Sequence, residues 1–330
     1  MKPQQLFAQS RNAMGTEFSI YLYAGDEAEA GMSFQAAFEE IERLDETLSN
    51  YRCSSEISRI NRLASRNAVT TDPEVFALLQ RSLEFSRRSD GAFDVTVGQL
   101  MRTWGFFRGQ GRYPTDDELC SSRENVGWEK LHLDPATRTV RFAAPGLELD
   151  LGAIGKGYAV DRAVKILRQV GVEAALVDAG SSTLHALNAP PRKNGWTVRV
   201  PKPGDRSETV STVTLCNESL STSGSYEKFF ELEGSRYCHV MDPRSGRPVQ
   251  GVLQTCLIAT DSTTTDALSN AMFVLGPKAA QQLLGTIDQG RGLWAVGEPE
   301  LPRWVPWRWR DCSIDGNGQI SLKPKVEHAK

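Results

Sequence analysis

The sequence predicts an α+β fold. Three observations indicate it: strand patterns occur in clusters, a few helical patterns separate the clusters, and their order is not a regular strand–helix–strand alternation. The chain has 330 residues, enough for one large domain or two small ones, and no repeat or linker-like stretch divides it. Its 40% hydrophobic and 24% charged content excludes disordered, fibrous and small disulfide-rich proteins.

In the N-terminal half, apolar and polar residues alternate over 18–22, which predicts a half-buried strand. Apolar residues at helical spacing predict an amphipathic helix over 27–48. A second helix is expected over about 74–88, because Asp72-Pro73 is a helix start signal. Short strands separated by turns are expected at 131–133, 139–142 and 147–151.

In the C-terminal half, the segment 152–157 opens a helix whose apolar stripe extends to Val170. Two further helices are expected at about 262–275 and 277–284. Strands are expected at 174–177, 196–200, 210–215, 237–241 and 253–259.

Charge and cysteine content limit the possible partners and compartment. The formal net charge of -3 gives no basic field, so dedicated nucleic-acid binding is not expected. No apolar run approaches the roughly 20 residues that a membrane span needs, and residues 1–10 show no signal-peptide pattern. The six cysteines are scattered without a C-x-x-C pair, which is typical of free buried thiols in a reducing compartment. We therefore expect a cytoplasmic protein.

A glycine-rich segment, GAIGKG at 152–157, lies between a predicted strand and a predicted helix. Backbone N–H groups at such a junction can hold phosphate. The spacing fits neither the dinucleotide-binding nor the Walker A pattern. Close packing that requires small residues explains the glycines equally well, so both interpretations stay open.

Three polar segments of the C-terminal half could carry chemistry. The run STSGS at 221–225 could donate to phosphate or ribose oxygens, or form a polar turn. His239 precedes the turn DPRSGRP and could be a general base at a strand end or a packed strand residue. Asp266 and Asn270 lie on one helix face and could ligate Mg²⁺, or Asp266 could cap the helix.

Aromatic residues beside small polar residues follow each of the first two predicted helices, over 49–61 and 91–106. Such residues can sandwich a flat ring, or they can be core and capping residues.

Taken in order, these segments resemble the ApbE-type FAD:protein FMN transferase family. Each motif is weak alone, but the ordered set is specific, and the resemblance covers about 13–284. The matching segments are MGT at 14–16, SNYRCSSEI at 49–57, GAFD at 91–94, DLGAIGKGYAVD at 150–161, STSG at 221–224, HVMDPRSGRP at 239–248 and TDALS at 265–269.

The resemblance implies a single T-fold-like flavin transferase domain over 5–298, with mostly antiparallel sheets and flanking helices. Such an enzyme cleaves FAD, passes FMN to a Thr or Ser hydroxyl of an acceptor flavoprotein and releases AMP, with Mg²⁺ as cofactor. Two alternatives stay open: an FAD pyrophosphatase that gives FMN and AMP, and a non-catalytic FAD-binding protein.

The resemblance also implies residue roles. Asp266, Asn270 and the carbonyl of Ala153 would hold Mg²⁺, and Lys156 with the 152–157 amides would steady the phosphates. His239, or Asp242 beside it, would take the proton of the acceptor hydroxyl. The residues expected to contact FAD are Met14, Ser49, Tyr51, Phe93, Asp94, Trp104, Phe106, Asp161, Asp178, Gly180, Ser181 and Ser223.

The chain departs from the family pattern in three ways. Asn270 stands where Ser or Thr is common, and DAGSS at 178–182 stands where a Gly-Gly-Asp-like segment is common. Many members are exported lipoproteins, whereas no export signal is visible here, so a cytosolic or cytosol-facing acceptor is expected.

A Trp- and Arg-rich extension is expected over 299–330. The segment 294–311 holds four of the seven tryptophans. We favour packing against the domain over an acceptor-docking patch.

Overall fold

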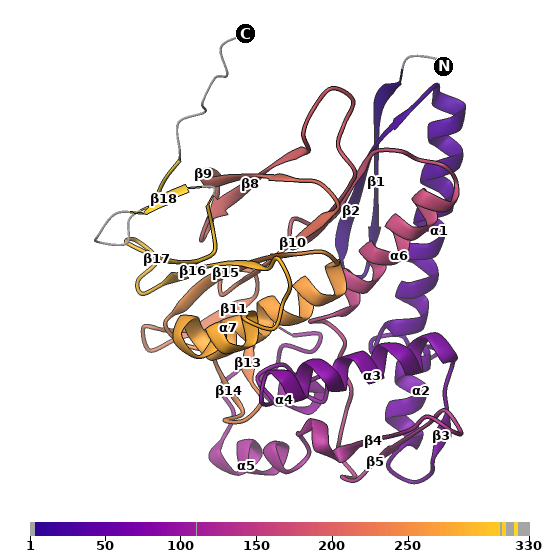
Figure 1. Ribbon diagram of the computed structural model, residues 1–330. Helices are drawn as coiled ribbons and strands as arrows, with labels where there is room; N and C mark the ends of the chain where they lie inside the picture. The colour runs from indigo at the N-terminus through magenta and orange to yellow at the C-terminus, as the bar shows by residue number, and fades with distance from the viewer. Residues whose placement is uncertain (1–3, 110, 311, 315–319, 323–330) are drawn as a thin grey trace.

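The computed structural model describes residues 4–109, 111–310, 312–314 and 320–322 (Figure 1). Its centre is an eight-stranded sheet in the order β1-β2-β6-β7-β10-β15-β16-β17. Every neighbouring pair in this sheet is antiparallel, which confirms the α+β prediction. The strands are β1 (Gln5–Ala13), β2 (Thr16–Ala24), β6 (Ala175–Ala179), β7 (Thr183–Leu187), β10 (Glu218–Gly224), β15 (Val252–Ala259), β16 (Arg291–Val296) and β17 (Arg303–Trp307).

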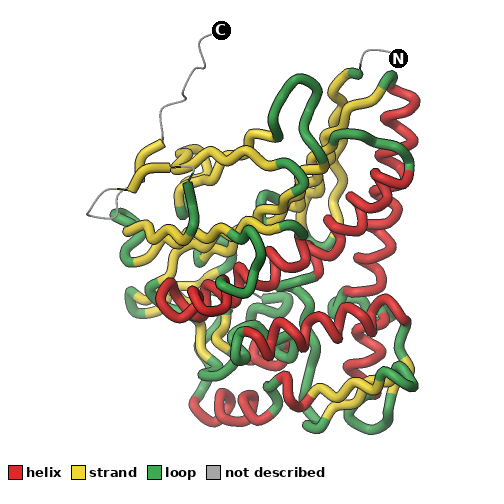
Figure 2. The backbone as a smooth tube through the Cα atoms, in the orientation of Figure 1, coloured by secondary structure: helices red, strands yellow, loops and turns green. Residues whose placement is uncertain are grey.

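Helices cover one face of this sheet, and a long hairpin covers the other (Figure 2). Helices α1 (Glu27–Leu48), α6 (Gly155–Gln169) and α7 (Ser262–Leu284) pack side by side, and α7 also contacts β10 and β15. The opposite face packs against β8 (Trp196–Lys202) and β9 (Asp205–Leu215). All eight residues of β15 are buried, because both of its faces are covered.

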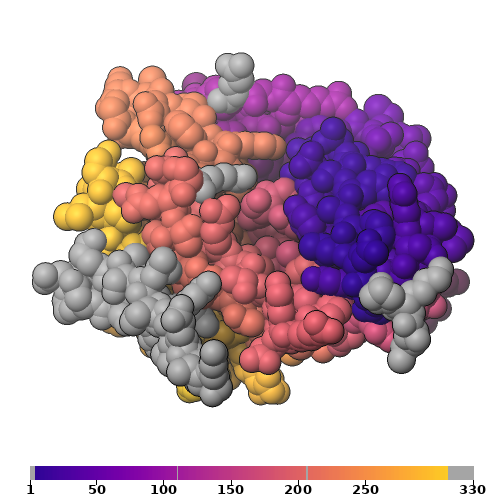
Figure 3. Space-filling view, turned by 90° about the horizontal axis from the view of Figure 1, so that it is seen from above, coloured from indigo at the N-terminus to yellow at the C-terminus, as the bar shows by residue number. Residues whose placement is uncertain are grey.

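A smaller, mainly helical part lies below the large sheet in the view of Figure 1. It contains α2 (Glu56–Leu63), α3 (Pro73–Arg88), α4 (Gly98–Thr103), α5 (Asp116–Glu124) and the three-stranded sheet of β3 (Val69–Thr70), β5 (Thr139–Phe142) and β4 (Leu131–Asp134). Seen from above, the N-terminal segments gather on one side of the molecule and the C-terminal half on the other (Figure 3).

Short two-stranded units complete the fold. They are β11 (Phe229–Leu232) with β12 (Ser235–Cys238), β13 (Met241–Asp242) with β14 (Arg247–Pro248), and β18 (Cys312–Ile314) with β19 (Ile320–Leu322). A 3-10 turn, Trp128–Lys130, precedes β4.

The predicted helices are confirmed. Side chains of Asp26 and Asp72 cap α1 and α3, and Pro73 occupies the first turn of α3, as the start signal indicated. The two helices expected between 262 and 284 form one run that is kinked at Gly276, where φ is 69°. This residue has the left-handed backbone that favours glycine.

The predicted strand at 147–151 is wrong, because this segment makes only a single bridge, between Glu148 and Val97. The Asn61 side chain satisfies the Leu149 backbone instead, donating to its carbonyl oxygen at 3.1 Å and accepting from its N–H at 2.8 Å. A side-chain partner thus replaces a neighbouring strand.

Two further expectations are corrected. The strand expected at 237–241 is interrupted at residues 239–240. Val170, expected on a buried stripe, is exposed beyond the end of α6.

The Trp-rich segment is largely packing. Trp294, Trp304 and Trp309 are buried, and β17 pairs with β16 at the end of the large sheet. This supports the packing interpretation over the docking patch for these three residues.

Cys53, Cys120 and Cys216 are free and exposed, which corrects the expectation that they are buried, whereas Cys238 and Cys256 are free and buried. Within the described ranges, every helix is too short or too polar to cross a bilayer.

Candidate active site

Helix α7 carries a buried carboxylate, Asp266, just after its first turn. One of its oxygens accepts from the Gly157 N–H at 2.8 Å, and the other accepts from the Thr183 hydroxyl at 3.1 Å. Burial raises the pKa of Asp266, while the nearby positive charge of Lys156 lowers it. The glycine-rich segment therefore lies directly against α7.

Gly157 is required by this close approach. A β-carbon at this position would overlap the Ser262 carbonyl oxygen and lie 2.6 Å from the Asp266 Cβ. Its N–H is used by Asp266, and the N–H groups of Gly152 and Gly155 donate to Asp150 and to the Leu151 carbonyl oxygen. These three amides are not free for a phosphate, so the packing interpretation explains the glycine at 157.

We predict that Gly157→Ala destabilises the protein by about 1–3 kcal/mol, because the added methyl group forces α6 and α7 apart. Gly155→Ala is the matched control, since its β-carbon would meet only the Leu151 Cβ, at 3.9 Å. Thermal unfolding of both variants measures the difference. Equal melting temperatures would show that the α6–α7 contact adjusts freely.

The N-terminus of α7 is held by two further aspartates. Asp161, from α6, accepts from the backbone N–H groups of Ser262 at 2.7 Å and Thr263 at 2.8 Å. Asp261 caps its own helix through the Thr264 N–H at 2.8 Å and binds Arg81 of α3. Asp161, expected to contact FAD, thus satisfies helix N–H groups that would otherwise lack partners.

A layer of buried hydroxyls separates α7 from the sheet. The Ser221 hydroxyl on β10 lies within hydrogen-bond distance of the Thr183 hydroxyl, at 3.0 Å, and of the Thr265 hydroxyl, at 2.8 Å. Ser223 lies 2.9 Å from the Ser269 hydroxyl. The Ser269 hydroxyl in turn donates to the Asp266 backbone carbonyl oxygen at 3.0 Å, so the predicted donor Ser223 is part of the hydroxyl network next to Asp266.

Asn270 lies one turn after Asp266 on α7. Its amide nitrogen donates to the Asp266 carbonyl oxygen at 3.1 Å. This leaves the amide oxygen without a partner among the residues that the structure describes. Ala153 is half-buried in the turn just before α6.

These residues fit Mg²⁺, which prefers oxygen ligands and is often held by one or two carboxylates together with substrate phosphates. Asp266 supplies a carboxylate, and each of its oxygens keeps a lone pair beyond its single hydrogen bond. The described residues contain no group of three or more His, Cys, Asp and Glu side chains able to hold a metal by themselves. A magnesium ion here would depend on phosphate oxygens as well.

His239 follows β12 and is half-buried. Its Nδ1 lies 3.2 Å from the Lys228 carbonyl oxygen. Because a carbonyl oxygen only accepts, the neutral ring carries its proton on Nδ1 and a lone pair on Nε2. Burial, together with the charges of Lys156 and Lys228, lowers the pKa of His239 to about 4 against the opposing effect of the Lys228 carbonyl hydrogen bond, so the ring is neutral near pH 7.

Lys156 affects the charge state of both Asp266 and His239. Its ammonium group lowers the pKa of both Asp266 and His239, which places the three side chains in one electrostatic environment. It makes no hydrogen bond or ion pair within the described part of the chain, so its charge is available to a ligand.

Asp242 is engaged elsewhere. Its carboxylate accepts from the Arg244 side chain at 2.9 and 3.1 Å and from the Arg244 backbone N–H at 3.0 Å. The carboxylate stabilises the turn between β13 and β14.

An aromatic pair joins the loop before α2 to the loop after α4. Tyr51 is 41% exposed and stacks on Phe107, with ring centroids 4.5 Å apart and planes 5° from parallel. The Arg102 guanidinium lies 3.6 Å from the centre of the Phe107 ring. The Ser49 hydroxyl accepts from the Tyr51 N–H at 3.2 Å and holds this turn.

The neighbouring Asn50 connects this turn to the loop before α6. Its amide donates to Asp150 at 3.1 Å, and Asp150 in turn accepts from the Gly152 N–H at 2.8 Å. Burial raises the pKa of Asp150.

Two turns meet at the ends of the neighbouring strands β2 and β6. Met14, in the β1–β2 turn, has a φ of 50°. Thr16 in the same hairpin fills the space where a β-carbon on Gly180 would lie. Asp178 accepts from the Ser181 N–H at 2.8 Å, which shapes the β6–β7 turn. The turn ends at Thr183, the partner of Asp266.

Phe93 and Trp104 are core residues. Phe93 packs edge-on against Phe85, with ring centroids 6.1 Å apart. Trp104 is fully buried and donates to the Gly246 carbonyl oxygen at 2.9 Å. The structure favours the core alternative for both. Phe106 is buried but lies 6.5 Å from the His239 ring, centroid to centroid.

Asp94 is buried and accepts from the Thr96 N–H and hydroxyl, both at 2.8 Å. Burial raises its pKa to about 6. It lines a cavity of about 520 Å³ together with Arg244, the partner of Asp242.

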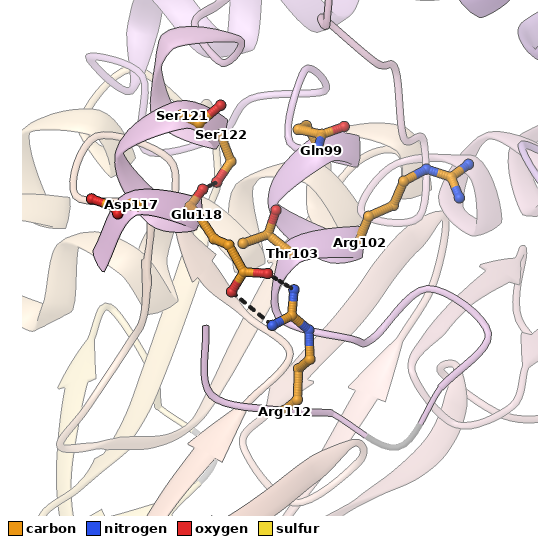
Figure 4. A pocket seen from close by; sticks show the side chains of 8 residues that line it. All are labelled: Gln99, Arg102, Thr103, Arg112, Asp117, Glu118, Ser121 and Ser122. Atoms are coloured by element: carbon orange, nitrogen blue, oxygen red, sulfur yellow. Dashed lines mark hydrogen bonds and ion pairs between the residues drawn. The ribbon is translucent and has the colours of Figure 1, made fainter. Parts of the chain in front are cut away.

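A second cavity, of about 490 Å³, lies between α4 and α5 (Figure 4). Arg112 and Glu118, which both line this cavity, form an ion pair at 2.8 Å. None of the predicted site residues lines this cavity.

Sequence reasoning missed Thr183, Asp150 and Lys228 as members of this region. Asp150 begins the 150–161 motif and could have been found there. Thr183 opens a strand whose five residues are all buried, so its pattern showed only packing. Lys228 contacts His239 through its backbone carbonyl, a group that every residue type carries, so the sequence could not indicate it.

Comparison with known proteins gives a consistent answer. The ApbE family model matches residues 14–293. A FAD:protein FMN transferase of Klebsiella pneumoniae (strain 342) is 32% identical over 97% of this chain and 98% of its own length. Another, from Treponema pallidum (strain Nichols), is 31% identical over 84% of this chain and 81% of its own.

Solved structures agree. The ApbE protein from Thermotoga maritima superposes with a TM-score of 0.84 at 28% identity, covering 92% of this chain and 97% of that one. The apo form of the Pseudomonas stutzeri flavinyl transferase ApbE has a TM-score of 0.82 at 28% identity, covering 92% and 95%.

Proposed function

This chain belongs to the ApbE family, and from that premise we propose that it is a FAD:protein FMN transferase. It moves FMN from FAD to a serine or threonine hydroxyl of an acceptor flavoprotein and releases AMP. One observation carries the assignment of the site: Lys156 acts electrostatically on both Asp266 and His239. This supports one site that combines a cation for phosphate, a carboxylate for the metal and a neutral base.

The reaction needs the anionic pyrophosphate to accept an oxygen nucleophile. The acceptor oxygen forms a bond to the phosphorus atom on the FMN side, and the bond from that phosphorus to the bridging oxygen breaks. AMP leaves with that oxygen, and the hydroxyl proton passes to Nε2 of His239. Lys156 neutralises negative charge as it builds up on the phosphates.

Mg²⁺, held by Asp266, Asn270 and the Ala153 carbonyl, would supply further charge neutralisation and orient the phosphates. The hydrogen bonds from Gly157 and Thr183 hold the Asp266 carboxylate in one orientation. The caps from Asp161 and Asp261 fix the N-terminal end of the helix that carries it.

Of the two candidate bases, His239 is favoured over Asp242. The Asp242 carboxylate is held by Arg244, whereas the Lys228 carbonyl leaves Nε2 of His239 with its lone pair. The exposed Tyr51–Phe107 pair is the proposed flat surface for a ring of FAD, since stacking on aromatic faces suits a planar ring system.

We also propose a cytosolic acceptor. The free and exposed thiols of Cys53, Cys120 and Cys216 support a reducing compartment, because exposed thiols do not persist in oxidising ones.

The test is to incubate the protein with FAD, Mg²⁺ and candidate cytosolic flavoproteins, and to measure AMP and flavin fluorescence of protein bands. We expect AMP together with one fluorescent acceptor. Free FMN and AMP without any acceptor would instead indicate a pyrophosphatase. Tight FAD binding with no product would indicate a binding protein.

We predict that Thr183→Val raises the Mg²⁺ concentration needed for half-maximal FAD cleavage about fivefold, because a lost hydrogen bond is worth about 1 kcal/mol. The matched control is Thr222→Val on β10, whose hydroxyl contacts the Cys256 sulfur at 3.5 Å instead. An unchanged Mg²⁺ requirement in Thr183→Val would mean that this hydroxyl does not orient Asp266.

A further inference from the structure

We propose that the outer edge of β11 is where the acceptor protein docks, by adding an extended segment as a third strand to the β11–β12 hairpin. This inference rests on the proposed function, because it names how the acceptor hydroxyl reaches His239. It requires three things of the hairpin: a free edge, a rigid support and a position beside the base.

The backbone pattern of the hairpin shows which groups point outward. The His239 N–H donates to the Lys228 carbonyl oxygen at 2.9 Å, so residues 228 and 239 form a hydrogen-bonded pair. Hydrogen-bonded and non-hydrogen-bonded pairs alternate along an antiparallel ladder. The pairs Phe229–Cys238 and Glu231–Arg236 are therefore of the second kind. The backbone N–H and C=O groups of Phe229 and Glu231 point away from β12.

The two edges of the hairpin differ. On β12, the Arg236 carbonyl oxygen is covered by the Gln250 side chain, which donates to it at 2.9 Å. On β11, no described residue makes a hydrogen bond to the outward backbone groups. Exposed strand edges pair readily with another chain, and proteins usually protect them with Pro, Lys or a covering segment. The edge sequence Phe-Phe-Glu-Leu has neither Pro nor Lys, and the charge of its Glu231 is paired with Arg236.

The side chains of β11 suit a protein partner. Phe229 is 38% exposed and Leu232 is 43% exposed. Arg236 lies 4.2 Å from the Phe229 ring centroid and pairs with Glu231 at 3.0 Å, so the exposed face mixes an aromatic ring with charges. Added strands gain affinity from main-chain hydrogen bonds and specificity from such side chains.

The hairpin is held rigidly from its other face. Phe230 stacks on Tyr237 with centroids 5.1 Å apart, and Tyr237 stacks on the buried Trp104 at 5.9 Å. Its free edge is therefore formed before the partner arrives, which lowers the entropy lost on binding.

The outer edge of β11 begins close to the proposed base, His239. β11 begins one residue after Lys228, whose carbonyl oxygen holds Nδ1 of His239. A strand added beside β11 would run about 4.8 Å from it and would advance about 3.3 Å per residue. His239 lies across Lys228 on the β12 side, about two strand spacings from the added strand. The acceptor segment would therefore cross over Lys228 after the paired stretch to bring its serine or threonine to His239.

The experiment compares Glu231→Pro with Glu231→Thr in the full chain. Both remove the carboxylate, but only proline removes the outward N–H, and proline is tolerated at a strand edge. The probes are the acceptor that becomes fluorescent in the assay above and N-acetylthreonine amide, a hydroxyl too short to pair with a strand. We expect Glu231→Pro to lose about tenfold in kcat/KM for the protein acceptor, whereas Glu231→Thr stays near the wild type.

FAD affinity and AMP release with N-acetylthreonine amide should be equal in all three proteins. Transfer by Glu231→Pro at the wild-type rate would overturn the inference, as would equal losses in both variants, which would assign the effect to the side chain. Absence of any transfer by the wild type would instead contradict the proposed function.

A second measurement uses the unaltered enzyme, in case Glu231→Pro disturbs the hairpin and lowers FAD affinity. A peptide with the acceptor sequence is compared with the same peptide N-methylated at alternate residues, which cannot donate to a strand edge. We expect the methylated peptide to be labelled at least about fivefold more slowly. Equal labelling of the two peptides would overturn the inference.

Discussion

Replacing Asp266 by alanine should lower the rate of FAD cleavage by about 100- to 1,000-fold, the usual effect of removing a group that stabilises transition-state charge. Asp266 is the buried carboxylate of the proposed Mg²⁺ site, and two hydrogen bonds hold it in place. The measurement is AMP release at saturating FAD and Mg²⁺, together with Mg²⁺ binding by calorimetry. Both signals should be lost.

Asp266→Ala also leaves the Gly157 N–H and the Thr183 hydroxyl without their partner, so its effect on folding must be separated from its effect on metal binding. Asp266→Asn is the second variant, because it keeps the side-chain shape while removing the charge. Asp261→Ala is the control on the same helix. It removes a cap worth about 1 kcal/mol but leaves the carboxylate at 266. If Asp266→Asn bound Mg²⁺ and cleaved FAD normally, the proposed metal site would be wrong.

The elements with strong periodicity could be predicted from the sequence, and those defined by long-range pairing could not. The helix over 27–48 has a cap and a clear apolar stripe, and the structure has the same bounds. The strand β7 reads as a short buried run, and β10 is rich in serine because its inner face forms hydroxyl contacts with α7. Neither pattern identifies a strand without knowledge of its neighbours.

The segment 147–151 illustrates the opposite error. Its alternating leucines are buried, as in a strand, but the Asn61 amide satisfies the backbone. Local sequence cannot show a partner that lies 88 residues away.

The same difference between local patterns and long-range contacts applies to the candidate site. The i and i+4 relation of Asp266 and Asn270 is local and was visible in the sequence. The influence of the Lys156 charge on the pKa of both His239 and Asp266 is a property of the fold, since the three residues come from separate segments of the chain. The glycine at 157 shows how two interpretations can share one residue: it packs α6 against α7, and its N–H also binds the Asp266 carboxylate.

Replacing His239 by glutamine should slow transfer to the acceptor by about 100- to 10,000-fold, the usual contribution of a general base, with FAD affinity unchanged. The lowered pKa of about 4 gives this prediction a pH signature. Above pH 4 the ring is neutral and accepts a proton at Nε2, so kcat/KM of the wild type should stay level from about pH 5 to 8. It should fall as the pH drops through 4, because the protonated ring cannot act as a base.

Bound FAD should raise the pH at which activity falls on the acid side of the pH profile. The negative pyrophosphate beside Lys156 offsets the positive charge that lowers the pKa of His239, so the acid limb of kcat should lie at higher pH than that of kcat/KM. Asp242→Asn is the control, since its carboxylate is already paired with Arg244 and should affect the turn more than the proton transfer. A His239→Gln enzyme with wild-type transfer, beside an inactive Asp242→Asn enzyme, would assign the base to Asp242 instead.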